Sequence, residues 1–118
     1  MRDIKFRAWN YKSFEMLYFD NNDMWDTNWL NMPECMQYTG LKDKKGQEVY
    51  EGDIIEGWPI IGNDPIKAKV IFHEKKGMWL AEEIHHEYSE TEYLFEILKD
   101  DRHQAKVIGN IHENPELL

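Results

Sequence analysis

The sequence has a single cysteine, no long hydrophobic run and no excess of basic residues. The lone thiol, Cys35, excludes an internal disulfide and suits a reducing compartment, in which we expect it to be buried and inert. No stretch approaches the roughly 20 apolar residues that span a bilayer, so no membrane segment is expected. The N-terminus also lacks the apolar core of a signal peptide. Together these absences predict a cytoplasmic protein.

Basic residues are too few and too scattered for a nucleic-acid-binding surface. The chain has 14 Lys and Arg against 23 Asp and Glu, a net charge of -9. Contact with a phosphate backbone usually needs a stripe of Lys and Arg, because counterion release supplies much of the affinity. The two basic clusters, Lys42/Lys44/Lys45 and Lys75/Lys76, both fall in predicted turns. Direct nucleic-acid binding is therefore not expected.

Large apolar side chains are abundant, and their spacing predicts a fold that is mainly β. Hydrophobic residues make up 42% of the 118 residues and aromatic residues 14%, enough for one domain with its own core. Ile4, Phe6 and Ala8 alternate with polar neighbours, which predicts an N-terminal β-hairpin over residues 4–19. We expect a small SH3-like or partly open β-barrel whose core spans about residues 35–112, the whole chain 1–118 forming a single domain.

The stretch from residue 35 to residue 55 reads as short strands joined by tight turns. Asp43 and Gly46 mark one turn, since an Asp side chain accepts backbone amides and glycine adopts positive φ. Gly52 and Asp53 mark a second turn for the same reasons. Asp53 is a carboxylate that could act as a general base, but its place in a Gly-Asp turn favours capping. All four residues are predicted to have structural roles.

The C-terminal part is predicted to contain one short helix and a closing strand. Ser89 and Glu92 fit a capping box, and apolar residues at Tyr93, Leu94, Ile97 and Leu98 favour a helix near residues 89–98. An extended segment over residues 93–98 is the alternative. Residues 105–112 predict the closing strand, interrupted at Gly109 where a bulge is expected.

No group of residues predicts catalysis, a cofactor or a metal centre. His85 and His86, beside several glutamates, form the most metal-like group, since imidazole and carboxylate are common ligands of divalent metals. Adjacent histidines on a strand point to opposite faces, however, and no third ligand has the spacing of a known motif. A solvated acidic loop is the favoured interpretation. His73 and His112 have no nucleophile at a recognisable position, so the protein is not expected to be an enzyme.

Tryptophans are the candidate partner-binding residues. Trp25 and Trp29 lie in the aromatic stretch 24–34, which has no clean periodicity, and Trp58 lies between two turn signals. Such side chains provide recognition surfaces for peptides, or they can plug the end of a barrel. Trp25, Trp29 and Trp58 are therefore possible contacts to a partner, although for Trp25 and Trp29 the favoured interpretation is a loop that plugs the end of the barrel.

Several ordered blocks of sequence resemble one family. They are KFRAW (residues 5–9), MQYTGLKD (36–43), Gly46, YEGDII (50–55) and VIGNIHENPELL (107–118). In this order they are similar to the YopX family of bacteriophage and prophage proteins. The resemblance implies a mainly β protein of phage or prophage origin in the bacterial host cytoplasm, without an assigned activity. It brings no catalytic residues to this sequence.

Two classes of function remain open. The first is a non-enzymatic accessory protein that binds a protein partner, or itself as a homo-oligomer, through sheet edges and aromatic loops. The second is an acidic DNA mimic, in which the carboxylates of residues 73–118 imitate a phosphate backbone and occupy a host nucleic-acid-binding protein. The first class is preferred.

Overall fold

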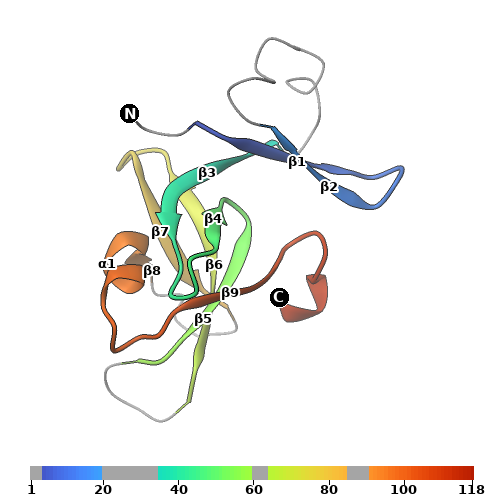
Figure 1. Cartoon of the computed structure of the whole chain (residues 1–118). Coiled ribbons are helices and arrows are strands. Elements are labelled where there is room, and N and C mark those ends of the chain that lie inside the picture. Colours follow the sequence, from blue (N-terminus) through green and yellow to red (C-terminus); the bar gives the residue numbers. More distant parts are fainter. Residues whose placement is uncertain (1–3, 20–34, 60–63, 85–90) are drawn as a thin grey trace.

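The computed structural model describes residues 4–19, 35–59, 64–84 and 91–118, and these ranges form mostly β-strands (Figure 1). The elements in these ranges are β1 (Phe6–Asn10), β2 (Glu15–Phe19), β3 (Cys35–Lys42), β4 (Glu48–Tyr50), β5 (Asp53–Gly57), β6 (Ile66–His73), β7 (Met78–Glu83), β8 (Thr91–Tyr93), α1 (Leu94–Lys99), β9 (Lys106–Asn110) and the 3-10 turn η3 (Pro115–Leu117). The prediction of a mainly β fold with one short helix is confirmed.

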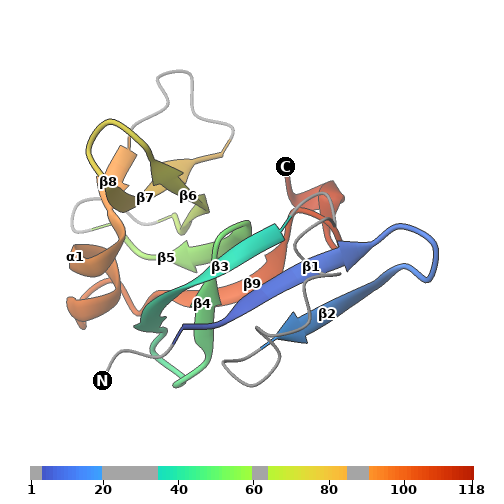
Figure 2. The same cartoon turned by 90° about the horizontal axis from the view of Figure 1, so that it is seen from above.

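The strands form two antiparallel sheets that curl into a barrel-like body. One has the order β2-β1-β3-β4 and the other β8-β7-β6-β5-β9. The β1–β2 hairpin extends from one end of the molecule, and α1 lies at the opposite end (Figure 2). The N-terminal hairpin predicted over residues 4–19 is therefore present, with Phe6 paired to Phe19 and Asn10 to Glu15.

The core lies between the two sheets and α1. Leu94 and Val49 are fully buried and pack with other apolar side chains of the cluster: Ile55, Ala68, Val70 and Ala81. A helix as short as α1 has little stability of its own in water, so its position depends on this packing. No helix in the described ranges is long and apolar enough to cross a membrane.

The helix begins later than the sequence pattern predicts. Residues 91–93 form β8, in which Tyr93 pairs with Leu80 of β7, and only then does α1 begin. Tyr93 is the residue before the first turn, and no side chain caps that turn. Ser89, the predicted cap, lies outside the described residues. Strand pairing with β7 therefore overrides the helical pattern at its N-terminal end.

The closing strand is also shorter than predicted. β9 ends at Asn110 because the Asn110 side chain oxygen accepts hydrogen bonds from the amides of His112 (3.0 Å) and Glu113 (2.8 Å), which turns the chain. Ile54 pairs with Gly109 and Ile55 with Val107, so one extra residue of β9 bulges between them. A Cβ atom at Gly109 would lie 2.4 Å from the Asn114 side chain oxygen, so a side chain at position 109 would require Asn114 to move.

The Asp43 side chain joins the first predicted turn to β9. One of its oxygens accepts hydrogen bonds from the amides of Lys45 (2.9 Å) and Gln47 (2.8 Å), and the other accepts one from Val107 (2.8 Å). Gly46 completes the turn with a φ of 84°. The carboxylate thus satisfies amides that the turn leaves without backbone partners, and it connects two segments far apart in sequence.

The second predicted turn connects the two sheets. Gly52 has a φ of 86°, its amide donates to the carbonyl of Val70 (2.9 Å), and its own carbonyl accepts from Ile111 (3.0 Å). Asp53 follows, and its carboxylate accepts a hydrogen bond from the amide of Tyr50 (2.7 Å). Glycine permits the positive φ, so the chain can leave β4 and enter β5 within two residues.

Arg7 and Asp53 form a buried ion pair beneath this turn. Their closest atoms are 2.8 Å apart, and each side chain is only 3% exposed. Arg7 also donates to the carbonyl of Glu51 (3.1 Å), and its guanidinium lies 4.9 Å from the centre of the Tyr50 ring. The alternation in β1 places Arg7 on the polar face, but the structure buries it because Asp53 supplies a partner.

The thiol of Cys35 is not in the core, contrary to the sequence-based expectation. Cys35 is exposed at the start of β3. Partial burial of the thiol and the nearby charge of Glu51 raise its pKa, which disfavours the reactive thiolate.

Burial also raises the pKa values of Asp53 and Tyr50. For Asp53, loss of solvent is the main cause, while the charge of Arg7 and the hydrogen bond from Tyr50 oppose it. For Tyr50, burial and then the charge of Glu48 raise the pKa to about 12. The carboxylate therefore depends on Arg7 to stay ionised inside the protein.

Replacing one partner of the buried ion pair should destabilise the fold strongly. The Asp53→Asn variant keeps an acceptor for the Tyr50 amide but leaves the Arg7 charge buried without a carboxylate. We expect the free energy of unfolding, measured by urea denaturation, to fall by about 3 to 5 kcal/mol. The double variant Arg7→Met/Asp53→Asn should recover much of this loss, because no buried charge remains. A double variant as unstable as Asp53→Asn would contradict the assignment.

The pKa of Tyr50 should be visible in the alkaline stability of the protein. Its ordinary value of 10.0 applies to the unfolded chain, so between pH 10 and about pH 12 only the unfolded chain releases this proton. The stability that neutral Tyr50 provides is therefore lost as pH rises through this window. In Tyr50→Phe the free energy of unfolding should fall less steeply with pH in this window. The difference in slope should correspond to the release of about one proton fewer on unfolding. Urea denaturation at a series of pH values measures both slopes, and identical slopes would contradict the assignment.

Candidate functional site

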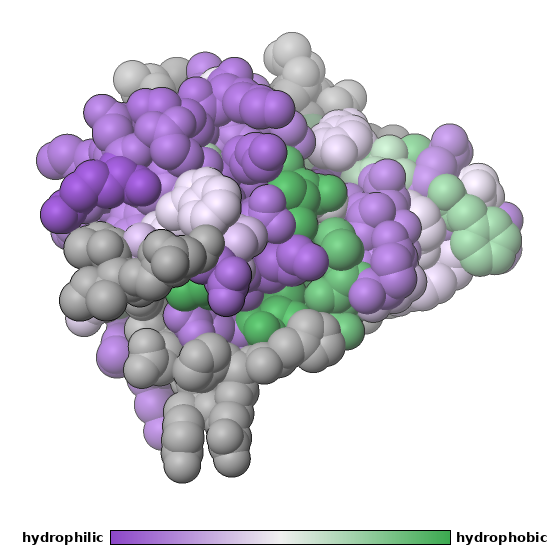
Figure 3. Space-filling view, turned by 90° about the horizontal axis from the view of Figure 1, so that it is seen from below, coloured by the Kyte–Doolittle hydropathy of each residue, from purple (hydrophilic) through white to green (hydrophobic). Residues whose placement is uncertain are grey.

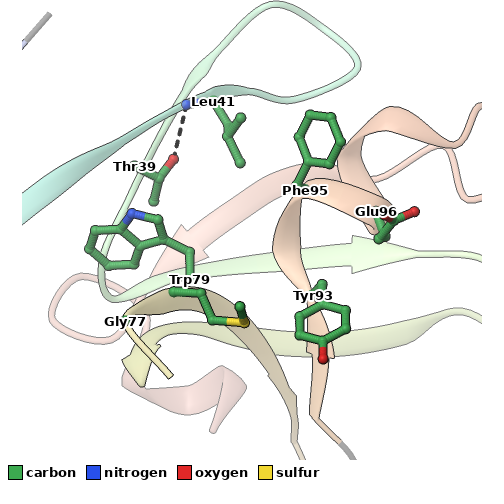
Figure 4. Close-up of a pocket in the computed structure, with 8 residues that line it drawn as sticks. Thr39, Leu41, Gly77, Trp79, Tyr93, Phe95 and Glu96 are labelled. Atoms are coloured by element: carbon green, nitrogen blue, oxygen red, sulfur yellow. Dashed lines mark hydrogen bonds between the residues drawn. The ribbon is translucent and has the colours of Figure 1, made fainter. Parts of the chain in front are cut away.

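An open groove lies where α1, the end of β8 and the β6–β7 hairpin face the edge of β3. Its volume is about 470 Å³, and Figure 4 shows the side chains that surround it. The lining residues are mostly apolar: Thr39, Leu41, Gly77, Met78, Trp79, Tyr93, Phe95 and Glu96. On a chain with a net charge of -9, an open apolar groove is the feature that most needs an explanation.

The base of the groove is continuous with the protein core. Leu41 and Trp79 are partly buried and pack against the core cluster, and Phe72 contacts Trp79 edge to face at 5.0 Å. The Thr39 hydroxyl donates to the carbonyl of Val49 (2.7 Å) and accepts from the amide of Leu41 (3.2 Å), which fixes this part of β3. The base is therefore preorganised before anything binds.

The outer wall consists of half-exposed aromatic side chains. Tyr93 is 51% exposed and Phe95 is 50% exposed, whereas Leu94 between them is completely buried. Burial of Leu94 anchors the chain at this point and directs its two neighbours outward. Met78, 36% exposed, completes the wall from β7. Tyr93 is thus a groove residue and not part of the buried face on which the helical pattern placed it.

Two lysines border this wall. The Lys76 ammonium lies 5.9 Å from the centre of the Tyr93 ring, and the Lys99 ammonium lies 5.3 Å from the centre of the Phe95 ring. Within the described ranges neither ammonium forms an ion pair with a carboxylate. The rim therefore offers positive charge next to apolar surface, and Glu96 adds one carboxylate to the lining.

The chemistry of these side chains is that of binding. Aromatic, aliphatic and thioether groups offer apolar contact area, and the lysines offer charge-assisted hydrogen bonds. Among the residues that the structure describes, no three His, Cys, Asp or Glu side chains gather closely enough to hold a metal ion. Figure 3 shows that apolar surface is gathered in a band on an otherwise mostly hydrophilic face.

Most sequence-predicted partner and metal residues cannot be placed in this groove. Trp25, Trp29, His85 and His86 all lie outside the described residues. Trp58 is 47% exposed just after β5, where its amide donates to the carbonyl of His103 (2.7 Å), and it does not line the groove. This hydrogen bond to His103 holds the loop after β5 to the turn before β9.

The predicted turn residues also lie away from the groove. The side chains of Asp43 and Asp53 bind backbone amides within the fold, and neither Gly46 nor Gly52 lines the groove. Trp79 and Phe95 were not predicted as binding residues. For Phe95 the available signal was its position, because it lies off the apolar face of Tyr93, Leu94, Ile97 and Leu98 in the predicted helix.

Several acidic side chains of the C-terminal third have partners within the protein. Asp100 pairs with Arg102 (2.6 Å), and hydrogen bonds from Arg102 hold the pKa of Asp100 well below its ordinary value. Asp101 pairs with Lys44 (2.5 Å) and Glu113 accepts from Asn110 (3.2 Å). These contacts give the carboxylates local structural roles, and a mimic of a phosphate backbone remains an untested prediction.

Comparisons with known proteins place the chain in a family. Protein EF1440 from Enterococcus faecalis has a crystal structure similar to this one, with 29% sequence identity and a TM-score of 0.61, over 98% of this chain and 97% of that chain. A search of curated proteins found no match. The family description that matches is "YopX protein", over residues 23–118. Since this match covers most of the chain, the protein belongs to the YopX family.

Proposed function

We propose that this protein is a non-enzymatic accessory protein of bacteriophage or prophage origin that binds other polypeptides in the bacterial cytoplasm. The groove between β3, β7 and α1 is the proposed docking site. The observation that carries this proposal is the half-exposed aromatic wall of Tyr93 and Phe95 above a preorganised base of Leu41 and Trp79. The resemblance of the ordered sequence blocks to phage and prophage proteins supports the origin.

The groove has the composition of an interface that receives an apolar anchor. Aromatic residues and methionine are enriched in protein interfaces, and binding energy concentrates where a buried anchor fills a preformed pocket. Tyr93 and Phe95 keep about half of their surface in water, and burying it beneath a partner is favourable by about 25 cal/mol per Å². The base is already fixed by core packing, so little order has to be gained on binding.

The charges on the rim specify the chemistry of the partner. Lys76 and Lys99 each place an ammonium beside an aromatic ring, without a carboxylate partner in the described part of the chain. A bound segment with Asp or Glu next to its apolar anchor would pair with these ammoniums at the edge of the groove. The preferred ligand is therefore a segment with an aromatic or aliphatic anchor flanked by carboxylates.

Selection of short peptides tests this function. A displayed library of random peptides, panned on the wild-type protein, should yield sequences with an aromatic or aliphatic anchor beside Asp or Glu. In Phe95→Ser, which removes an exposed wall residue, the affinity of these peptides measured by fluorescence anisotropy should fall about tenfold or more.

The matched control is Trp58→Ser, because Trp58 is exposed to a similar degree but lies outside the groove. This variant should bind the selected peptides as the wild type does. Peptides that bind Phe95→Ser as tightly as the wild type, or a library that yields no binders, would contradict the proposed function.

A further inference from the structure

Two hairpins of this protein end in the same turn but carry different residues at its last position. In the β1–β2 hairpin the amide of Phe14 donates to the carbonyl of Asn10, and in the β6–β7 hairpin the amide of Gly77 donates to the carbonyl of His73, both at 2.8 Å. Asn10 pairs with Glu15, just as His73 pairs with Met78. Phe14 and Gly77 therefore have to adopt the same backbone conformation.

This backbone conformation is unfavourable for Phe14. Its φ is 55° and that of Gly77 is 62°, both in the left-handed region that glycine adopts without strain and that a bulky side chain disfavours. The Phe14 side chain is also 74% exposed, so packing within the chain does not offset the strain. A strained residue whose side chain projects into water points to a role outside the fold.

The hairpin is held firmly enough to present Phe14 to a partner. The side chain oxygen of Asn10 accepts hydrogen bonds from the amides of Lys12 (2.9 Å) and Ser13 (3.3 Å), which orders the turn. Next to the turn, the rings of Trp9 and His112 stack with their centres 5.5 Å apart, and Tyr11 contacts the same His112 ring edge to face, with the ring centres 6.0 Å apart. Phe14 is therefore an apolar side chain on a fixed support.

The tip of this hairpin has the chemistry that the groove requires. Phe14 offers an aromatic anchor, and the exposed carboxylate of Glu15 follows it directly. The rim lysines Lys76 and Lys99 can pair with this carboxylate, while Lys12 of the tip carries the charge complementary to Glu96. The tip and the groove lie at opposite ends of the molecule, so they cannot meet within one chain (Figures 1 and 2).

From these observations, and resting on the proposed function of the groove, we infer that the partner is a second copy of this chain. Phe14 of one copy docks in the groove formed by Trp79, Tyr93 and Phe95 of the next copy. Two different surfaces meet in such a contact, so one copy keeps an unoccupied groove and the other an unoccupied tip for further copies. The protein therefore assembles head to tail, into a ring or an open chain.

Two complementary variants test this inference. Phe14→Gly removes the anchor and gives the turn the residue found at position 77, and Phe95→Ser damages the groove but leaves the tip intact. By light scattering, the molar mass of the wild type should exceed that of the monomer and rise with concentration. Each variant alone should remain monomeric. Their equimolar mixture should form a dimer and nothing larger, because only one intact tip and one intact groove can meet.

Two controls separate docking from folding. At a dilution at which the wild type is also monomeric, the melting temperature of Phe14→Gly should be no lower than that of the wild type, because glycine relieves the strain at this position. Trp58→Ser should self-associate as the wild type does. A monomeric wild type, or a mixture of the two variants without dimers, would overturn the inference.

Failure of this inference can be distinguished from failure of the proposed function. Phe14→Gly keeps its groove, so peptides selected on the wild type should bind it with unchanged affinity. Retained peptide binding with a monomeric wild type would leave the groove as a docking site and overturn only its assignment to a second copy. Loss of both would overturn both.

Discussion

The buried ion pair between Arg7 and Asp53 is the interaction on which the arrangement of this protein depends. Arg7 belongs to β1 in the first sheet and Asp53 to β5 in the second sheet, so the pair fixes one sheet against the other. Burying either charge without the other would be strongly destabilising, so the hairpin has to stay next to the turn at Gly52. The hairpin tip extends away from α1, which lies at the other end of the molecule (Figure 2).

The groove depends on a second constraint, the burial of Leu94. The six residues of α1 do not form a stable helix alone, so the core must hold them in place. A fully buried Leu94 satisfies this need and turns Tyr93 and Phe95 toward water. The packing that stabilises the short helix thus also creates an apolar wall.

Local features were predictable from the sequence, and features that depend on a distant partner were not. The turns at Asp43 and Gly52 and the N-terminal hairpin follow from backbone chemistry within a few residues. Arg7 was expected on the polar face because its buried partner, Asp53, lies far away in the sequence. Tyr93 looked buried because its pairing with β7 was not visible in the local pattern. The binding wall was missed for the same physical reason.

The most direct test of the account is to observe the groove while a second copy is added. Isotope-labelled Phe14→Gly, whose groove is intact, can be titrated with unlabelled Phe95→Ser, whose hairpin tip is intact, and followed by amide chemical shifts. Docking of the tip in the groove should give saturable shifts that cluster at Leu41, Trp79, Tyr93 and Phe95. Shifts confined to other parts of the labelled chain, or no shifts at all, would contradict it.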